Sequence, residues 1–138
     1  MTETRTITAL SSQELARITE VLRANGIRYA LIFGSAAEDA LGFDSDLDLA
    51  VSADQVLSSE QRFRLIEALA SACGRPIDLV DLRSARGGIF AKALRGRELF
   101  CDSLRAKAAA LYRRASLIEE DLDVSRRSFA AAQARMFR

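Results

Sequence analysis

The stretch "FGSAAEDALGFDSDLDLAV", residues 33–51, decides which fold this sequence encodes. It contains the pair Gly34-Ser35 and, after ten intervening residues, Asp46-Leu47-Asp48 at the head of an apolar run. Five carboxylates fall in this window, although the whole chain has a formal net charge of only +1. The window is either a solvated acidic loop or a place that holds a metal ion, and the rest of the sequence has to separate these interpretations.

A strand is expected on each side of the acidic window. Residues 27–33, "IRYALIF", are aliphatic enough for a central strand. Residues 46–51, "DLDLAV", alternate strictly, so that Asp46 and Asp48 share one face with Ala50. Both carboxylates therefore point to one side of the strand, about 7 Å apart along the chain at a rise of roughly 3.3 Å per residue.

Helices alternate with further strands over most of the remaining chain. The patterns predict helices over 11–25, 59–73 and 84–96, a strand over 76–82 and an edge strand over 97–102. Ser11 with Glu14 fits a capping box at the start of the first helix, and Gly26 and Gly74 suit the ends of the first two. The sequence therefore predicts an α/β fold, a small mixed sheet covered by helices.

The last part of the chain, residues 103–138, contains neither Gly nor Pro and is expected to be one long helix. Steps of four and three residues from Leu104 to Met136 give a mainly apolar heptad seam with a polar break at Ser125. We expect residues 1–102 to form the domain proper and residues 103–138 to be its helical extension. The seam either folds back onto the sheet or contacts a helical partner or a second copy.

Composition removes several classes of function. The chain has no histidine, which excludes Ser-His and Cys-His catalysis and removes the commonest zinc ligand. Cys73 and Cys101 form no metal-type pair, and without a signal peptide they are expected to be reduced packing residues of a cytoplasmic protein. No apolar run could span a bilayer, and the near-neutral charge gives no reason to expect a membrane or nucleic-acid surface. Any bound metal would be held by oxygen, as magnesium, manganese or calcium are.

A third carboxylate could complete an oxygen-ligated site. In "PIDLVDL", Asp78 and Asp81 differ by an odd number of residues, so they face opposite sides of a regular strand and only one can join Asp46 and Asp48. The apolar neighbours favour Asp78. The Gly-Ser turn after an apolar strand offers free backbone N–H groups and a hydroxyl, the parts of a small phosphate cradle.

These residues carry a resemblance to a known family. Gly34-Ser35 followed at this spacing by Asp46-Leu47-Asp48 resembles the G-S-x10-D-x-D signature of minimal nucleotidyltransferases, within the polymerase-β-like superfamily. "PIDLVDL" and "LRGRELF" are similar to later segments of that family, so the likeness covers about residues 12 to 102. It implies the nucleotidyltransferase fold. It also implies that Gly34 and Ser35 bind a nucleotide triphosphate, that Asp46 and Asp48 ligate Mg²⁺, in a two-ion site, and that Asp78 is a third ligand or a base.

The resemblance also implies a function. Short chains of this family are typically antitoxins that transfer AMP from ATP to a tyrosine of a partner HEPN ribonuclease toxin. The alternative is a protein of the same fold that neutralises its partner by binding alone, and transfer to a small molecule such as an aminoglycoside is a third possibility. One departure bears on this choice: "AAEDALG" lacks the basic residues that family loops carry after the Gly-Ser pair. Either triphosphate binding is weaker, or an arginine from another part of the chain contributes to it, or the protein binds its partner without transferring a nucleotide.

Overall fold

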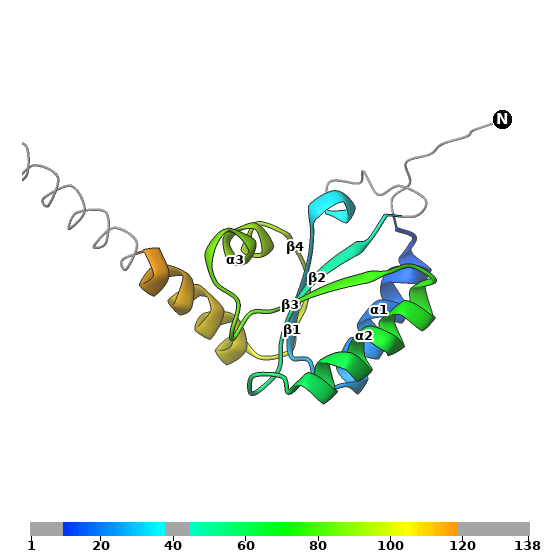
Figure 1. Ribbon diagram of the computed structural model, residues 1–138, viewed down its shortest axis with the longest axis horizontal. Helices are drawn as coiled ribbons and strands as arrows, with labels where there is room; N and C mark the ends of the chain where they lie inside the picture. The colour runs from blue at the N-terminus through cyan, green and yellow to red at the C-terminus, as the bar shows by residue number, and fades with distance from the viewer. Residues whose placement is uncertain (1–9, 38–44, 119–138) are drawn as a thin grey trace, which may run out of the picture.

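The computed structural model describes residues 10–37 and 45–118, and the strands within these ranges form one sheet. They are β1 (Tyr29–Phe33), β2 (Leu47–Ser52), β3 (Ile77–Asp81) and β4 (Arg97–Cys101), in the order β3-β2-β1-β4. β1 is antiparallel to both β2 and β4, whereas β2 and β3 are parallel (Figure 1). The predicted small mixed sheet is confirmed, with β1 in its interior and β4 at an edge.

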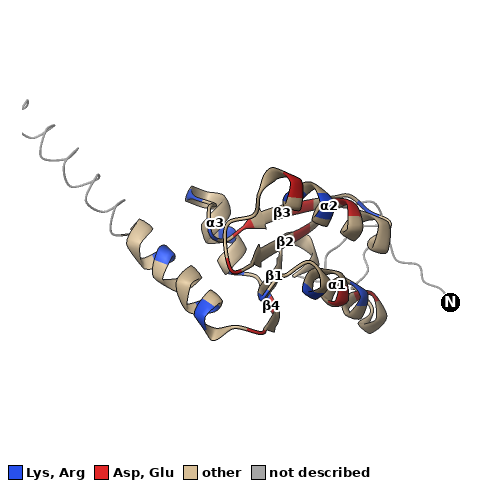
Figure 2. Cartoon of the chain, turned by 90° about the horizontal axis from the view of Figure 1, so that it is seen from below, with Lys and Arg blue, Asp and Glu red and all other residues tan. Residues whose placement is uncertain are grey.

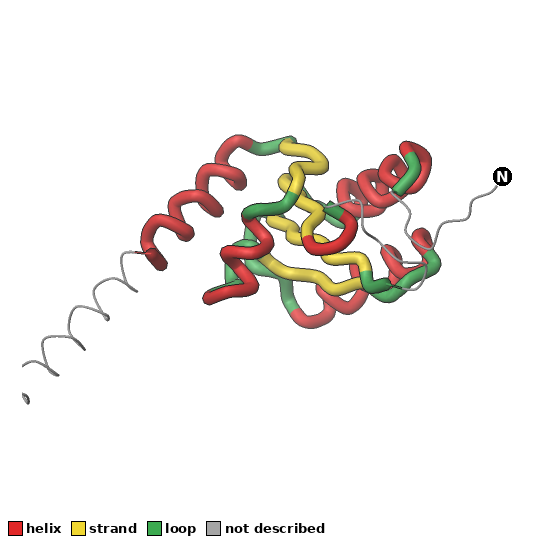
Figure 3. The backbone as a smooth tube through the Cα atoms, turned by 90° about the horizontal axis from the view of Figure 1, so that it is seen from above, coloured by secondary structure: helices red, strands yellow, loops and turns green. Residues whose placement is uncertain are grey.

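Helices cover both faces of this sheet (Figure 3). α1 (Ser12–Ala24) and α2 (Ser59–Cys73) share one hydrophobic cluster with the strands, and α3 (Gly87–Leu94) shares the other with a helix over residues 104–118. α1 and α2 each begin with a capping box, and α2 ends at Gly74 in the left-handed conformation. These local signals place both helices within one residue of the predicted bounds.

The alternation in β2 decides which face of the sheet carries the acidic residues. Leu47, Leu49 and Val51 belong to the cluster under α1 and α2, whereas Ala50 belongs to the cluster under α3. Because side chains alternate along a strand, Asp48 lies on the same side as Ala50. The predicted division of this strand is confirmed for residues 47–51, whereas Asp46 immediately precedes β2.

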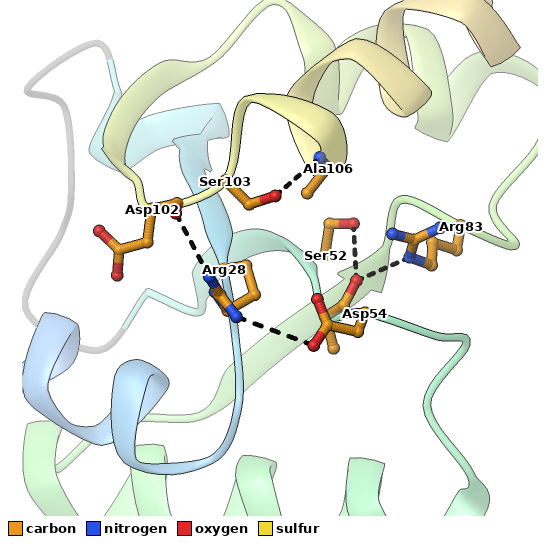
Figure 4. A network of polar contacts seen from close by, with 8 residues as sticks. Arg28, Ser52, Asp54, Arg83, Asp102, Ser103 and Ala106 are labelled. Carbon is orange, nitrogen blue, oxygen red and sulfur yellow. Dashed lines mark hydrogen bonds and ion pairs between the residues drawn. The ribbon is translucent and has the colours of Figure 1, made fainter.

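Polar contacts hold the end of the sheet opposite the Gly-Ser turn (Figure 4). Arg28, just before β1, donates from Nη2 to the carbonyl oxygen of Asp102 at 3.4 Å, and its Nη1 lies 3.8 Å from Oδ2 of Asp54. Arg83 donates from Nε to the carbonyl oxygen of Ala53 at 2.7 Å. These contacts join the segment before β1 to those that follow β2, β3 and β4, so the four strands are tied together at this end.

Gly96, between α3 and β4, allows a close approach of the chain to the end of β1. A Cβ atom at this position would lie 2.3 Å from the carbonyl oxygen of Ile32 and 2.8 Å from Cβ of Phe33. Gly96→Ala is therefore expected to lower the free energy of unfolding by about 1–3 kcal/mol, because the backbone of β1 cannot yield as a flexible side chain could. The measurement is the midpoint of denaturant unfolding at unchanged slope.

Gly88 provides the matched control for this prediction. It lies inside α3, and a Cβ atom there would meet nothing within 4 Å. Gly88→Ala should leave stability unchanged or raise it by up to about 1 kcal/mol, since alanine is the better helix former. Equal unfolding midpoints for Gly96→Ala and the wild type would contradict the close approach.

The helix over residues 104–118 packs on the sheet through a face other than the predicted seam. Ala106 and Ala110 are buried in the cluster under α3, with Leu117 packed against it. The seam positions within the described residues are all exposed: Leu104, Ala108, Leu111, Ala115 and Ile118. Folding of the seam onto the sheet is therefore wrong for these positions, and contact with a helical partner or a second copy stays a prediction. The seam positions beyond residue 118 lie outside the described residues.

Two further expectations concern the cysteines and the membrane. Cys73 and Cys101 are free thiols of intermediate burial. Burial raises the pKa of the Cys73 thiol, which lowers its thiolate fraction and agrees with a packing role. Across residues 10–37 and 45–118, no helix is both long and apolar enough to cross a bilayer.

Candidate active site

Two aspartates of neighbouring strands lie side by side on the face of the sheet that α3 covers. Asp48 of β2 is the register partner of Asp78 in the parallel strand β3, and Phe33 at the end of β1 is its partner on the other side. Asp46 immediately precedes β2, and its charge acts on Asp48. The structure thus brings Asp48 and Asp78 together, with Asp46 near enough for its charge to act on Asp48, and these three residues are called the carboxylate cluster below.

The surroundings of Asp48 disfavour its negative charge. Burial is the largest cause that raises the pKa of this carboxyl group, followed by the charge of Asp78, and a hydrogen bond with Asp78 and the charge of Asp46 act in the same direction. Lys92 of α3 opposes them and lowers the pKa. A half-buried carboxylate among like charges is a position where a bound cation would relieve repulsion.

The Gly-Ser turn is packed against this carboxylate. A short 3-10 helix, η1 (Gly34–Ala36), follows β1 directly, and Gly34 has a φ of +67°, in the left-handed region. A Cβ atom on Gly34 would lie 2.2 Å from Oδ2 of Asp48, so only glycine fits between the turn and the strand. Ser35 is exposed beside it. The acidic residues of the following loop, at 38–44, lie outside the described residues.

Asp81 has a structural role away from this cluster. It is only 3% exposed, and its side chain accepts hydrogen bonds from the backbone N–H groups of Leu57 at 2.8 Å and of Arg83 at 2.9 Å. Its register partner in β2 is Val51, on the α1 and α2 side of the sheet. Of the two aspartates in β3, only Asp78 shares the face of Asp48, as the alternation predicts.

The sequence analysis missed a group of basic residues next to the Gly-Ser turn. A cavity of about 240 Å³ beside Gly34 is lined by Lys92, Arg95 and Arg97, from the end of α3 and the start of β4. Arg97 also donates from Nη2 to the carbonyl oxygen of Ala36 at 3.3 Å, so it braces the turn. The signal in the sequence is "KALRGR", three cations within six residues, but its place beside the turn follows only from the packing of α3.

The carboxylate cluster has the donor chemistry of a magnesium site. Carboxylate oxygens are the protein ligands that Mg²⁺ prefers, usually one or two of them together with substrate phosphates. Among the described residues, no group of three or more His, Cys, Asp or Glu side chains is close enough to hold a metal ion by itself. The oxygen donors and the disfavoured charge of Asp48 fit magnesium, and the individual ligand roles remain a proposal.

The sheet, the Gly-Ser turn and the paired aspartates make this an α/β domain with a candidate carboxylate site at one end of its strands. Residues 16–105 match the family described as "Polymerase beta, Nucleotidyltransferase". This match spans well over half of the chain and includes Gly34, Ser35 and the three aspartates. The chain therefore belongs to this nucleotidyltransferase family.

Individual relatives agree with this assignment. The chain is 42% identical over 71 residues to "Protein adenylyltransferase MntA" of Shewanella oneidensis (strain MR-1), a region that covers 50% of this chain and 51% of that protein. The aligned part thus spans about half the length of the curated relative.

Two solved structures share the fold over nearly their whole length. One, a toxin-antitoxin with AMP-PNP, superposes with a TM-score of 0.69 at 27% identity, over 83% of this chain and 94% of that one. Another, tri-AMPylated Shewanella oneidensis HEPN toxin in complex with MNT antitoxin, gives a TM-score of 0.66 at 25% identity, over 87% and 95%. The predicted nucleotidyltransferase fold is confirmed.

Proposed function

We propose that this protein transfers AMP from ATP to a tyrosine hydroxyl of a HEPN ribonuclease toxin, with Mg²⁺, and thereby neutralises that toxin as its antitoxin. The observation that carries the proposal is the contact between the turn at Gly34 and Asp48, which is itself paired with Asp78. In this contact the Gly-Ser turn lies directly against a carboxylate whose negative charge its surroundings disfavour. The relatives reported above, an adenylyltransferase and a complex of an AMPylated HEPN toxin with its antitoxin, support the choice of AMP and of the partner.

Each site residue has a part in this proposal. Gly34 and Ser35 bind the phosphates through backbone N–H groups and a hydroxyl. Asp46, Asp48 and Asp78 hold Mg²⁺, with Asp78 either a third ligand or the base toward the acceptor hydroxyl. When bound, Mg²⁺ supplies neutralisation of charge on the attacking and leaving oxygens.

The proposed transfer is an in-line displacement at the α-phosphorus. The tyrosine oxygen forms a bond to the α-phosphorus, and the bond from that phosphorus to the oxygen bridging to the β-phosphate breaks. Pyrophosphate leaves with the electron pair, and the hydroxyl proton passes to a base. A tyrosine ester of AMP remains on the partner.

The test uses ATP labelled at the α-phosphate and, separately, at the γ-phosphate. The full-length protein is incubated with Mg²⁺, labelled ATP and a HEPN toxin from the same source. We expect label on the toxin from the α position only, and none when the acceptor tyrosine is replaced by phenylalanine or the metal is chelated. Ribonuclease activity of the toxin should fall as label accumulates.

The outcomes separate the two classes of function. Toxin inhibition without label from either position would contradict AMP transfer and favour neutralisation by binding alone. Label from the γ-phosphate would indicate phosphoryl transfer in place of nucleotidyl transfer.

A further inference from the structure

The cavity beside Gly34 is a site for negative charge. Its lining includes Lys92, Arg95 and Arg97, and no acidic residue is among the described residues that line it. No ion pair joins Lys92 or Arg95 to a carboxylate of the described residues. Like charges gathered around a hollow repel one another unless an anion neutralises them. Figure 2 shows the basic residues along α3, on the side of the sheet opposite α1 and α2.

The size of the cavity limits what it can hold. Its volume of about 240 Å³ is below the range of roughly 300–1,000 Å³ that takes a drug-sized ligand, so it cannot enclose a whole nucleotide. It can hold phosphate groups, which are small, charged and rich in acceptor oxygens. Lysine and arginine are the side chains that proteins use for such groups.

The position of the cavity joins it to the carboxylate cluster. Gly34 lines it and also contacts Asp48, and Lys92 lines it while its charge acts on Asp48. A polyphosphate whose first phosphate lies at the carboxylates therefore has its later phosphates within reach of α3. The cavity thus extends the candidate active site along the direction of a triphosphate.

We propose that Lys92 and Arg95 bind the β- and γ-phosphates of the nucleotide in this cavity. This rests on the proposed function, and it assigns the triphosphate contacts that the loop after Ser35 lacks. Arg97 has a positioning role, since its guanidinium holds the carbonyl oxygen of Ala36 in the turn. The cations stabilise the departing pyrophosphate as well as the bound nucleotide. In this chain α3 performs the task that basic loop residues perform in the resembling family.

The experiment measures the binding of three probes to the full-length protein with Mg²⁺: ATP, AMP and inorganic tripolyphosphate. Lys92→Gln and Arg95→Gln are each expected to weaken ATP and tripolyphosphate binding by about 10- to 100-fold, the usual worth of a hydrogen bond to a charged group. AMP has no β- or γ-phosphate, so its affinity should change by less than about threefold. Lys92→Arg should restore most of the ATP affinity, because it restores the charge.

A matched control removes the same number of charges elsewhere. Arg86 and Arg114 are exposed and do not line this cavity; Arg86 precedes α3, and Arg114 lines a different pocket together with Gly87 and Phe90. Arg86→Gln and Arg114→Gln, each made as a single variant, should leave the affinities for all three probes near those of the wild type. A similar loss of affinity in the cavity variants and in the control variants would show that these cations act only by long-range attraction. That result would overturn the assignment.

The results separate this inference from the proposed function. If the wild type transfers AMP but Lys92→Gln and Arg95→Gln bind ATP normally, the cavity assignment is overturned and the proposed function stands. If no AMP transfer occurs but the two variants lose ATP and tripolyphosphate binding selectively, the cavity assignment stands. A wild type that binds neither ATP nor tripolyphosphate would overturn it outright.

Discussion

Asp48→Asn is expected to lower AMP transfer by at least about 100-fold, because even residues that only support metal ligands cost 10- to 100-fold when they are changed. The same variant is expected to have a higher melting temperature than the wild type in metal-free buffer at neutral pH. The physical reason is that the fold disfavours the charge of Asp48 through burial and through Asp78, and an amide carries no charge. Thermal unfolding and the labelled-ATP assay together check the prediction.

The raised pKa of Asp48 determines how the stability difference between Asp48→Asn and the wild type depends on pH. The folded state raises the pKa of Asp48, so the folded protein binds more protons than the unfolded chain between the ordinary aspartate pKa, about 3.9, and the raised value. The contribution of Asp48 to wild-type stability therefore falls as pH rises through this window. The advantage of Asp48→Asn should be present above the window and fade progressively as pH falls below about 4, as the carboxyl becomes protonated in both states.

Asp81→Asn is the control for the stability measurement. Asp81 is buried and accepts two backbone hydrogen bonds, from Leu57 and Arg83. Its amide variant should be less stable than the wild type by about 1–3 kcal/mol, because one accepting oxygen becomes a donor that faces a donor. Added Mg²⁺ should raise the melting temperature of the wild type more than that of Asp48→Asn. A lower neutral-pH stability for Asp48→Asn would contradict the charge argument.

Gly34→Ala is the second change with a large expected effect. Its positive φ alone costs an alanine about 1–2 kcal/mol, and its Cβ atom would also overlap Oδ2 of Asp48. Either the turn or the carboxylate has to move. Because a displacement of about 1 Å at a reacting group can cost about 100-fold, we expect AMP transfer to fall by that factor or more. Denaturant unfolding and the transfer assay measure the two effects.

Gly74→Ala separates backbone strain from the contact with Asp48. Gly74 has a φ of +69°, close to that of Gly34, but a Cβ atom there would meet nothing within 4 Å. It ends α2, and an added methyl group there would touch no carboxylate of the cluster. Gly74→Ala should therefore lose about the same 1–2 kcal/mol from strain and keep its transfer activity. Equal activity losses in the two variants would show that the turn at Gly34 has no special relation to Asp48.

Much of the candidate site could be predicted because its signals are local. The strict alternation of "DLDLAV" puts Asp48 on the face opposite Leu47 and Leu49 whatever the partner strands are. The odd separation of Asp78 and Asp81 means that one of them must turn away. Capping residues set the start of α1 at Ser12 through hydrogen bonds only three residues apart. In each case the interaction that decides the structure lies within a few residues.

Local sequence signals could not predict where the cations of the cavity lie or which face of the helix over residues 104–118 packs on the sheet. Lys92 and Arg95 reach the turn at Gly34 only because α3 packs across the sheet, a contact between segments almost sixty residues apart. The heptad seam is a real periodicity, yet the helix packs on the sheet through Ala106 and Ala110, which lie outside the seam. The sequence by itself determined the strands, the acidic face and the Gly-Ser turn, since these depend on backbone geometry and alternation. Tertiary packing decided which cations join the site and which helix face is left exposed, since both depend on contacts between distant segments.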